Sequence, residues 1–201
     1  MAQAIAVLRN GVAIADPLGV ALGFLDAYSQ YEAIEASPMS FAEPDLRLAN
    51  RGGARISAAQ IAAILERRRA IERALRSIAP DSSLAGPVSA VPWLQLGRLF
   101  ETFADIRGVG ISKMTKALYP KRPALIPMLD SVVQAYLEED DLEPRAPFGE
   151  RALGLVRAYK RDLDRNRAAL RTVRRDLARR GHGLSEVRIL DLLIWSIEAE
   201  A

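Results

Sequence analysis

The stretch RGVGISKMTKALYPKRPALIPMLDSVV, residues 107–133, decides the fold of this chain. It contains two glycines, Gly108 and Gly110, on either side of Val109, between two segments whose apolar residues recur at helical spacing. Glycine supplies the positive φ of a sharp turn, and its missing Cβ allows another backbone to come close. The pattern therefore predicts a helix-hairpin-helix in which the second helix begins at Ile111.

The remaining periodicity predicts a chain that is almost wholly α-helical. Polar capping residues ahead of apolar repeats indicate the helix starts, and one of them is a Ser57-Ala-Ala-Gln60 capping box. Besides the helix from Ile111, the expected helices cover residues 17–31, 45–50, 57–78, 93–106, 130–137, 148–180 and 185–195. The fold class is all-α, organised as one helical domain over residues 1–201 or as two intertwined helical subdomains. Residues 93–137 hold the hairpin and the Asp-bearing helix that follows it.

One short β element interrupts the helical pattern near the N-terminus. Arg9-Asn10-Gly11 lies between two apolar segments, residues 5–8 and 12–14. Asn-Gly between apolar runs is typical of a tight β-hairpin. Two strands alone are marginally stable in water, which argues against a stable sheet, so a short N-terminal β-hairpin is an addition that the all-α prediction leaves open.

The composition excludes several classes of site. The chain of 201 residues has no cysteine, which excludes disulfides, thiolate nucleophiles and cysteine-bound zinc or iron–sulfur clusters. Its single histidine, His182, argues against a histidine-rich metal site. No apolar run approaches the roughly 20 residues that span a bilayer. We therefore expect a cytoplasmic protein with no membrane segment, no metal and no cofactor.

Positive charge is concentrated in one part of the chain. The formal net charge is only +3, but residues 157–180 contain ten Arg or Lys and three Asp. A tract of this kind is either a solvated helix face or an electrostatic footprint for phosphate groups.

The hairpin offers a more local site for phosphate. The first amides of a helix have no intrahelical acceptor and lie at the positive end of the helix dipole, where they suit an anion. The candidate DNA-binding residues are Gly108, Val109, Gly110, Ser112, Lys113, Lys116, Lys121 and Arg122. Contacts of this sort hold the phosphate backbone of DNA without reading its base sequence. The glycines alone are also explained by a tight connection between two helices.

The segment after the hairpin places one carboxylate, Asp130, at the end of an apolar stretch and at the start of a helix. Asp130 lies twenty residues beyond Gly110, in the sequence ALIPMLDSVV. This arrangement resembles the helix-hairpin-helix DNA glycosylases, in which a Gly-Val-Gly or Gly-Ile-Gly hairpin precedes a proline-containing apolar turn and a catalytic aspartate. The chain also resembles an uncharacterised bacterial family with a KRP-x-LIP-x-x-DSVV core.

The glycosylase resemblance implies that the amides of Gly108 and Gly110 hold a DNA phosphate and that Asp130 is the catalytic carboxylate. A carboxylate near the sugar can stabilise an oxocarbenium-like species or activate a water. Bifunctional members carry a lysine two residues after the second glycine, and Ser112 stands at that position here. The resemblance therefore implies monofunctional base excision. The four cysteines that hold an iron–sulfur cluster in some branches are absent.

For several residues, a structural role explains the residue type as well as a functional role does. Asp130 is a good helix N-cap, a role compatible with catalysis. Trp195 fits the core side of the last helix, and Arg188 can pair with Asp191 across one helical turn. Three functions remain open: a DNA glycosylase that uses Asp130, a non-catalytic DNA-binding module, and a protein-interaction or structural helical domain.

Overall fold

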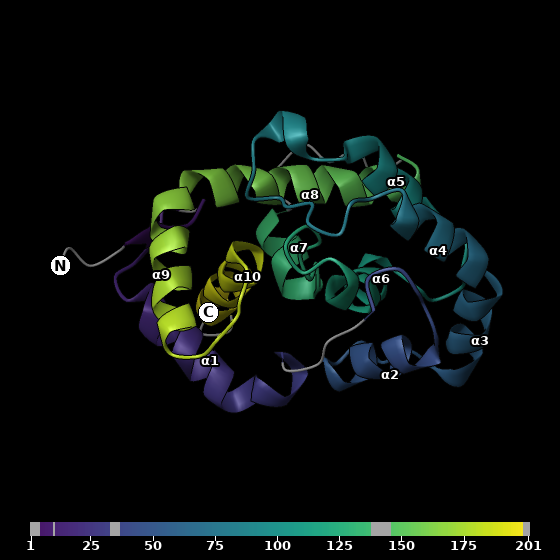
Figure 1. Ribbon diagram of the computed structural model, residues 1–201, viewed down its shortest axis with the longest axis horizontal. Helices are drawn as coiled ribbons and strands as arrows, with labels where there is room; N and C mark the ends of the chain where they lie inside the picture. Colours follow the sequence, from purple (N-terminus) through teal and green to yellow (C-terminus); the bar gives the residue numbers. More distant parts are fainter. Residues whose placement is uncertain (1–4, 10, 33–36, 138–145, 199–201) are drawn as a thin grey trace.

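The computed structural model of the protein describes residues 5–9, 11–32, 37–137 and 146–198, which form ten α-helices, two short 3₁₀ helices and one two-stranded sheet (Figure 1). The α-helices are α1 (Pro17–Glu32), α2 (Glu43–Arg51), α3 (Ala58–Glu66), α4 (Arg68–Arg76), α5 (Trp93–Glu101), α6 (Ile111–Leu118), α7 (Ser131–Leu137), α8 (Phe148–Arg165), α9 (Arg167–Arg179) and α10 (Glu186–Glu198). The remaining elements are η1 (Val88–Ala90), η2 (Tyr119–Lys121), β1 (Ala6–Val7) and β2 (Ala13–Ile14). The prediction of an all-α protein with a short N-terminal β-hairpin is confirmed.

Four helices begin at polar caps that the sequence identifies. In each, a side-chain oxygen of the cap accepts a hydrogen bond from a backbone N–H of the first turn, which satisfies one of the amides that lack an intrahelical partner. The caps are Asp16, Ser57, Asp130 and Ser185, with their oxygens 2.9, 3.3, 3.1 and 3.1 Å from the nitrogens of Gly19, Gln60, Val133 and Arg188.

Two segments predicted as single long helices are each interrupted once. The predicted helix 57–78 divides into α3 and α4 at Arg67, whose guanidinium donates to the carbonyl oxygen of Ala104 at 2.8 Å. The predicted helix 148–180 divides into α8 and α9 at Asn166, whose side-chain amide bonds both the N–H and the carbonyl of Val7, at 2.6 and 2.9 Å. At each break a side chain bonds a segment that is distant in sequence.

The first helix of the hairpin and the second helix of the chain differ from prediction in length. Helix α5 ends at Glu101, five residues before the predicted end at Ile106, and a series of turns follows that includes Asp105 with φ of 60°. Helix α2 runs over nine residues, where the sequence predicts one turn over residues 45–50. Asp45 helps to start α2, because its Oδ2 accepts from the N–H of Ala42 at 2.7 Å.

The predicted β-hairpin forms, and α8 anchors it. Ala6 pairs with Ile14 and Val7 with Ala13 in antiparallel register; Asn10 of the predicted turn lies outside the described residues. Arg9 donates from Nε to Asp162 Oδ2 at 2.9 Å. Two strands alone would be marginal, so these bonds to the helices stabilise the hairpin.

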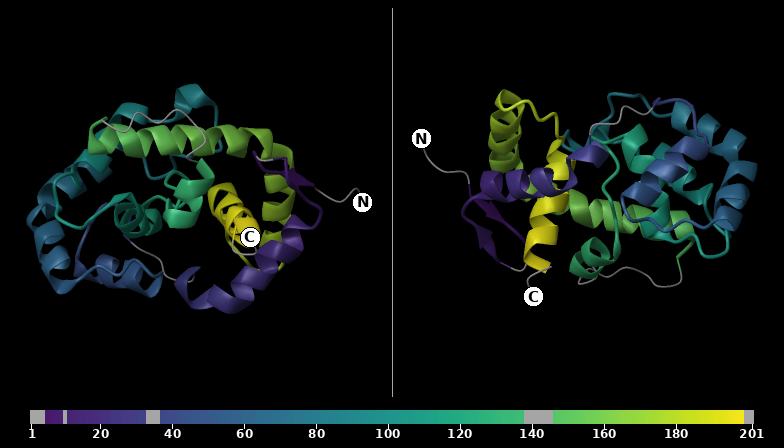
Figure 2. Two further views of the ribbon diagram at one scale, coloured as in Figure 1. Left: turned by 180° about the vertical axis from the view of Figure 1, so that it is seen from behind. Right: turned by 90° about the horizontal axis from the view of Figure 1, so that it is seen from below.

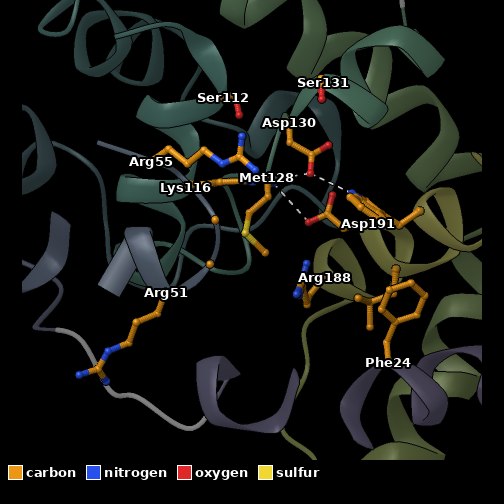
Figure 3. Close-up of a pocket in the computed structure, with 14 residues that line it drawn as sticks. Phe24, Arg51, Arg55, Ser112, Lys116, Met128, Asp130, Ser131, Arg188 and Asp191 are labelled. Carbon is orange, nitrogen blue, oxygen red and sulfur yellow. Dashed lines mark hydrogen bonds and ion pairs between the residues drawn. The ribbon is translucent and has the colours of Figure 1, made fainter. Parts of the chain in front are cut away.

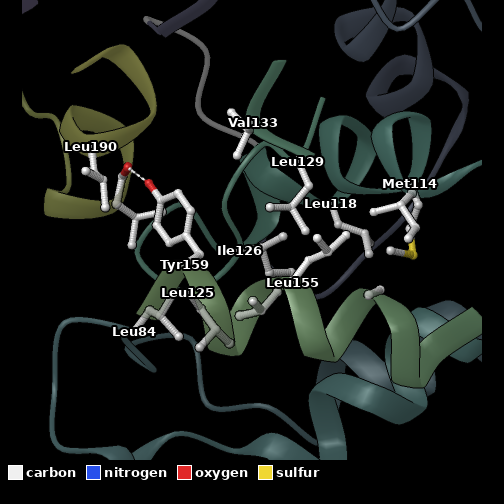
Figure 4. Packing of buried hydrophobic residues seen from close by; sticks show 14 of the residues in the cluster. Leu84, Met114, Leu118, Leu125, Ile126, Leu129, Val133, Leu155, Tyr159 and Leu190 are labelled. Atoms are coloured by element: carbon white, nitrogen blue, oxygen red, sulfur yellow. Dashed lines mark hydrogen bonds between the residues drawn. The ribbon is translucent and has the colours of Figure 1, made fainter. Parts of the chain in front are cut away.

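Helix α8 runs along one side of the molecule and connects its two ends. In Figures 1 and 2, α1 to α5, α8 and α9 surround α6, α7 and α10 in the view down the shortest axis. Figure 4 shows the buried side chains of Ile126 and Leu129 beside Leu155 of α8. Because Ile126 and Leu129 are fully buried, the segment that leads to Asp130 is held in place by the core.

Candidate functional site

The two glycines of the hairpin have different physical roles. Gly108 has φ of 73°, and a Cβ built on it would lie 2.5 Å from Nε2 of Gln60, which donates to the Gly108 carbonyl oxygen at 3.0 Å. Gly110 has φ of −92° and ψ of −178°, and a Cβ there would meet no described atom within 4 Å. The sequence prediction that both glycines serve a sharp turn or a close approach therefore holds for Gly108, whereas the fold places no such demand on Gly110.

Helix α6 begins at Ile111, as the sequence predicts, with Gly110 as its N-cap residue. Its first internal bond runs from the N–H of Met114 to the carbonyl of Gly110 at 3.1 Å, so the amides of residues 111–113 precede the helical ladder. Lys113, in the first turn of α6, donates from Nζ to Gln60 Oε1 at 2.8 Å. Gln60 thus ties Lys113 and the Gly108 carbonyl to the first turn of α3.

Two of the cationic residues predicted to contact DNA lie inside the fold. Lys121 is 3% exposed, and its Nζ bonds Asp45 Oδ1 at 2.6 Å and the carbonyl of Ser37 at 3.0 Å. Arg122 is 1% exposed, and its terminal nitrogens donate to the carbonyls of Pro38, Leu75 and Ile78 at 2.6, 2.8 and 2.9 Å. These contacts give both side chains a structural role, and we do not include them in a phosphate-binding surface.

Asp130 is held by contacts from three helices. Its Oδ1 accepts from the N–H of Val133 at 3.1 Å, which makes it the cap of α7. Its Oδ2 accepts from Nε1 of Trp195 on α10 at 2.8 Å and lies 3.8 Å from Nζ of Lys116 on α6. Trp195, which the sequence assigns to the core, is half-buried and orients this carboxylate.

The carboxylate of Asp130 lines a cavity of about 580 Å³ (Figure 3). This volume falls within the range of about 300–1,000 Å³ that is usual for small-molecule sites. Ser112 and Lys116 of α6 line the same cavity, so three of the predicted site residues meet there. Gly108, Val109, Gly110 and Lys113 do not line it but belong to the hairpin that carries α6.

The cavity also contains four charged residues that the sequence does not identify as site residues, Arg51, Arg55, Arg188 and Asp191. Four cations line it, Arg51, Arg55, Lys116 and Arg188, together with two acids, Asp130 and Asp191. Arg51 and Arg55 flank Gly52-Gly53-Ala54, the turn that follows α2. The signal that could have identified them is the pair of arginines around two glycines.

Asp191 of α10 is the least exposed of the charged residues that line the cavity. It is 1% exposed, its Oδ2 accepts from the N–H of Met128 at 3.2 Å, and its Oδ1 has no hydrogen bond from any described residue. Burial raises the pKa of Asp191 to about 7, against the opposing effect of Arg188 and with a further small increase from Asp130. The two residues that the sequence suggests as a pair across one helical turn are therefore an arginine at the cavity, Arg188, and a buried acid, Asp191.

The described part of the chain contains no cluster of three or more His, Cys, Asp or Glu side chains that could hold a metal ion. The ranges that the structure describes also contain no helix long and apolar enough to cross a membrane.

The fold and the cavity define a helical protein in which a Gly-Val-Gly hairpin lies next to a cation-lined pocket with two carboxylates. The chain belongs to a family of unknown function, DUF6308, whose model matches residues 23–198. No curated protein and no solved structure matches the chain. Family membership thus agrees with the resemblance to an uncharacterised family, and the resemblance to DNA glycosylases stays a prediction.

Proposed function

We propose that this protein binds DNA through the Gly108–Gly110 hairpin and admits one nucleotide to the cavity, where Asp130 promotes monofunctional base excision. The observation that carries the proposal is the position of Asp130. Its carboxylate lines a cavity of nucleotide size, and α6, which begins at the hairpin, forms one wall of that cavity.

The start of α6 supports the DNA-binding part of the proposal. The amides of residues 111–113 lie at the positive end of the helix, and Gly110 adds no side chain that would obstruct an approaching phosphate. Lys113 extends the positive charge at the same end. Backbone binding of this type is independent of base sequence and falls steeply with salt concentration.

The geometry of Asp130 supports the catalytic part. In base excision the N-glycosidic bond breaks and the base leaves with the bonding electron pair. A water oxygen bonds C1′, one of its protons stays on the new hydroxyl and the other is transferred to the base, which leaves an abasic site. Trp195 and Val133 fix the Asp130 carboxylate, so its negative charge is oriented before positive charge develops on the sugar. Ser112, which lines the cavity where the resemblance places a lysine, forms no Schiff base, and the strand would therefore stay intact.

A second candidate is DNA binding without chemistry. The observation that favours it is that both oxygens of Asp130 already accept hydrogen bonds within the protein. In this alternative Asp130 caps α7 and holds Trp195, and the cavity receives a nucleotide that is not cleaved.

DNA binding is tested first, with fluorescently labelled duplexes at low and high salt. Gly110→Glu should abolish binding because it places a carboxylate at the phosphate site, whereas Asp81→Asn in an exposed loop should leave it unchanged. Failure of the wild-type protein to bind any duplex at low salt would refute the proposal and select a protein-interaction or structural role.

Excision is tested on duplexes that carry uracil, alkylated or oxidised bases. We expect the wild-type protein to produce abasic sites on at least one of them, and Asp130→Asn to reduce the rate by about 10²-fold or more. Asparagine is an equally good N-cap, so the variant should keep α7. DNA binding without any abasic product would select the non-catalytic alternative.

A further inference from the structure

The cavity has two chemically different walls. Figure 3 shows Arg55, Lys116 and Ser112 on one side, and Asp191, Arg188 and Phe24 on the other. Four cations against two acids give the lining a formal charge of at least +2, which favours an anionic ligand.

Arg55 is placed to bind such an anion. It follows the Gly52-Gly53 turn, which is fixed because the side-chain amide of Asn50 bonds both the N–H and the carbonyl of Ile56, at 2.6 and 2.9 Å. In Figure 3 its guanidinium extends toward Asp130 and Lys116. No hydrogen bond or ion pair joins it to the rest of the described chain, and its own φ is 53°, an unfavourable value for a residue with a Cβ. An exposed guanidinium of this kind is available for the two oxygens of a phosphate.

Asp191 requires a different ligand group. Its buried Oδ1 accepts no hydrogen bond from the described residues. The nearby Tyr159 hydroxyl does not supply one, because it donates to the carbonyl of Val187 at 2.5 Å. A buried acceptor without a donor is costly, and a ligand N–H at this wall would satisfy it. Met128, Leu192 and Trp195 beside it offer apolar surface for a flat ring.

We propose that the cavity binds a nucleoside monophosphate unit whose base carries an exocyclic amino group, with the phosphate on Arg55 and Lys116 and the amino group donating to Asp191. This inference rests on the proposed function and deepens it, since it names the class of nucleotide that the site admits. Asp191 is in this view the residue that distinguishes an amino group from a carbonyl at the same position of a base.

The test is a set of binding titrations with free deoxynucleotides in two matched pairs, dCMP with dUMP and dAMP with dIMP. The members of each pair differ by an amino group in place of a carbonyl. At pH 8, above the pKa of about 7 to which burial raises Asp191, we expect the wild-type protein to bind the amino member about tenfold more tightly in each pair, as a hydrogen bond to a charged acceptor predicts. Asp191→Asn, which is nearly isosteric, should reduce the ratio to within about twofold, because its amide can also donate to a carbonyl.

Arg55→Gln tests the other end of the ligand. It should weaken all four nucleotides by a similar factor of about ten and leave the binding of deoxycytidine, which has no phosphate, unchanged. The matched control is Arg69→Gln, which removes an exposed charge from α4 away from the cavity and should change no affinity.

Equal binding of amino and carbonyl members by the wild-type protein would overturn the inference, as would an unchanged preference in a folded Asp191→Asn variant. Because the wild-type ratios are measured independently of any variant, the test holds even if Asp191→Asn fails to fold. Gly110→Glu separates this inference from the DNA proposal, since the hairpin lies outside the cavity. If that variant and the wild type both bind dCMP while neither binds DNA, the DNA proposal fails and the nucleotide site stands.

Discussion

Two polar clusters of this protein differ in the partners that their charged groups find. The inner cluster consists of Asp45, Lys121 and Arg122, where the lysine and the terminal arginine nitrogens bond protein oxygens at 2.6–3.0 Å. The cavity cluster consists of Arg55, Lys116, Asp130 and Asp191. There the ion pair of Lys116 and Asp130 is 3.8 Å long, and Asp191 Oδ1 has no partner in the described chain.

The difference indicates what each cluster does. Charges that leave water need compensating hydrogen bonds, and the inner cluster supplies them within the protein at Lys121 Nζ and at both terminal nitrogens of Arg122, whereas Arg122 Nε has no partner in the described chain. The cavity cluster leaves part of its hydrogen-bonding capacity for a ligand. Because lysine and arginine occur in both, the residue types alone do not separate the two roles.

The largest expected effect is on the inner cluster. Arg122→Ala should lower the free energy of unfolding by about 3–5 kcal/mol, because it leaves the carbonyls of Leu75 and Ile78 without their buried donor. Urea unfolding followed by circular dichroism measures the loss. Arg69→Ala on the exposed face of α4 should change stability by less than about 0.5 kcal/mol. An equally small effect of Arg122→Ala would break the distinction between the two clusters.

The second prediction concerns the pH dependence of stability through Asp191. Because its pKa in the folded protein, about 7, is above the ordinary value of 3.8, the folded state holds a proton that the unfolded state releases between those values. This contribution to stability is complete below about pH 4 and falls as the pH rises, by up to about 1.4 kcal/mol per unit, until about pH 7.

Asp191→Asn removes this titration. Between pH 5 and pH 8 the stability of the variant relative to the wild type should therefore rise by about 2–3 kcal/mol, measured by urea unfolding at each pH. The exposed Asp81→Asn provides the control and should run parallel to the wild type. If the stability of Asp191→Asn also changes with pH in parallel with that of the wild type, Asp191 is not the buried acid that the cavity cluster requires.

The local features of both regions could be predicted from the sequence, and the pairing of their charges could not. The caps at Ser57 and Asp130 depend on residues three positions apart, and the start of α6 depends on the adjacent glycine, so short-range chemistry is sufficient. Lys121 bonds Asp45, which lies 76 positions away, and sequence spacing carries no signal for such a contact.

At the candidate site, the burial of Asp191 likewise could not be predicted from the sequence. Helical spacing places it three residues after Arg188 and suggests a pair across one turn, but the bond from the N–H of Met128, 63 positions away, holds its carboxylate in the interior. The break at Asn166 likewise depends on Val7 at the other end of the chain. In each case a tertiary contact overrides a local pattern.

The third prediction sharpens the comparison between the two hairpin glycines. Gly108→Ala should cost about 1–2 kcal/mol, because alanine disfavours a φ of 73° and its Cβ would displace Gln60. Gly110→Ala should be neutral or stabilising by up to about 0.5 kcal/mol, since its φ is −92° and the space is open. Thermal unfolding of the two variants gives the difference. Equal losses would mean that the fold needs both glycines, and that Gly110 has no special relation to a ligand.

The smallest expected effect is a change in stability whose direction is the most informative. Arg55→Gly should stabilise the protein by about 0.5–1 kcal/mol, because glycine relieves the φ of 53°, and part of that gain is offset by the greater freedom of glycine in the unfolded chain. Arg51→Gly is the matched control four residues earlier. It removes the same charge from the last residue of α2, and it should destabilise by about 0.5–1 kcal/mol, since glycine is a poor helix former.

A residue whose backbone conformation lowers the stability of the protein is retained for another reason. Because Arg55 lines the cavity, we infer that this reason is ligand binding. The same Arg55→Gly protein should therefore be more stable than the wild type and bind nucleotides more weakly, measured by thermal unfolding and titration on one preparation. Loss of stability in Arg55→Gly would instead place Arg55 with the inner cluster, as part of the structure that supports the cavity.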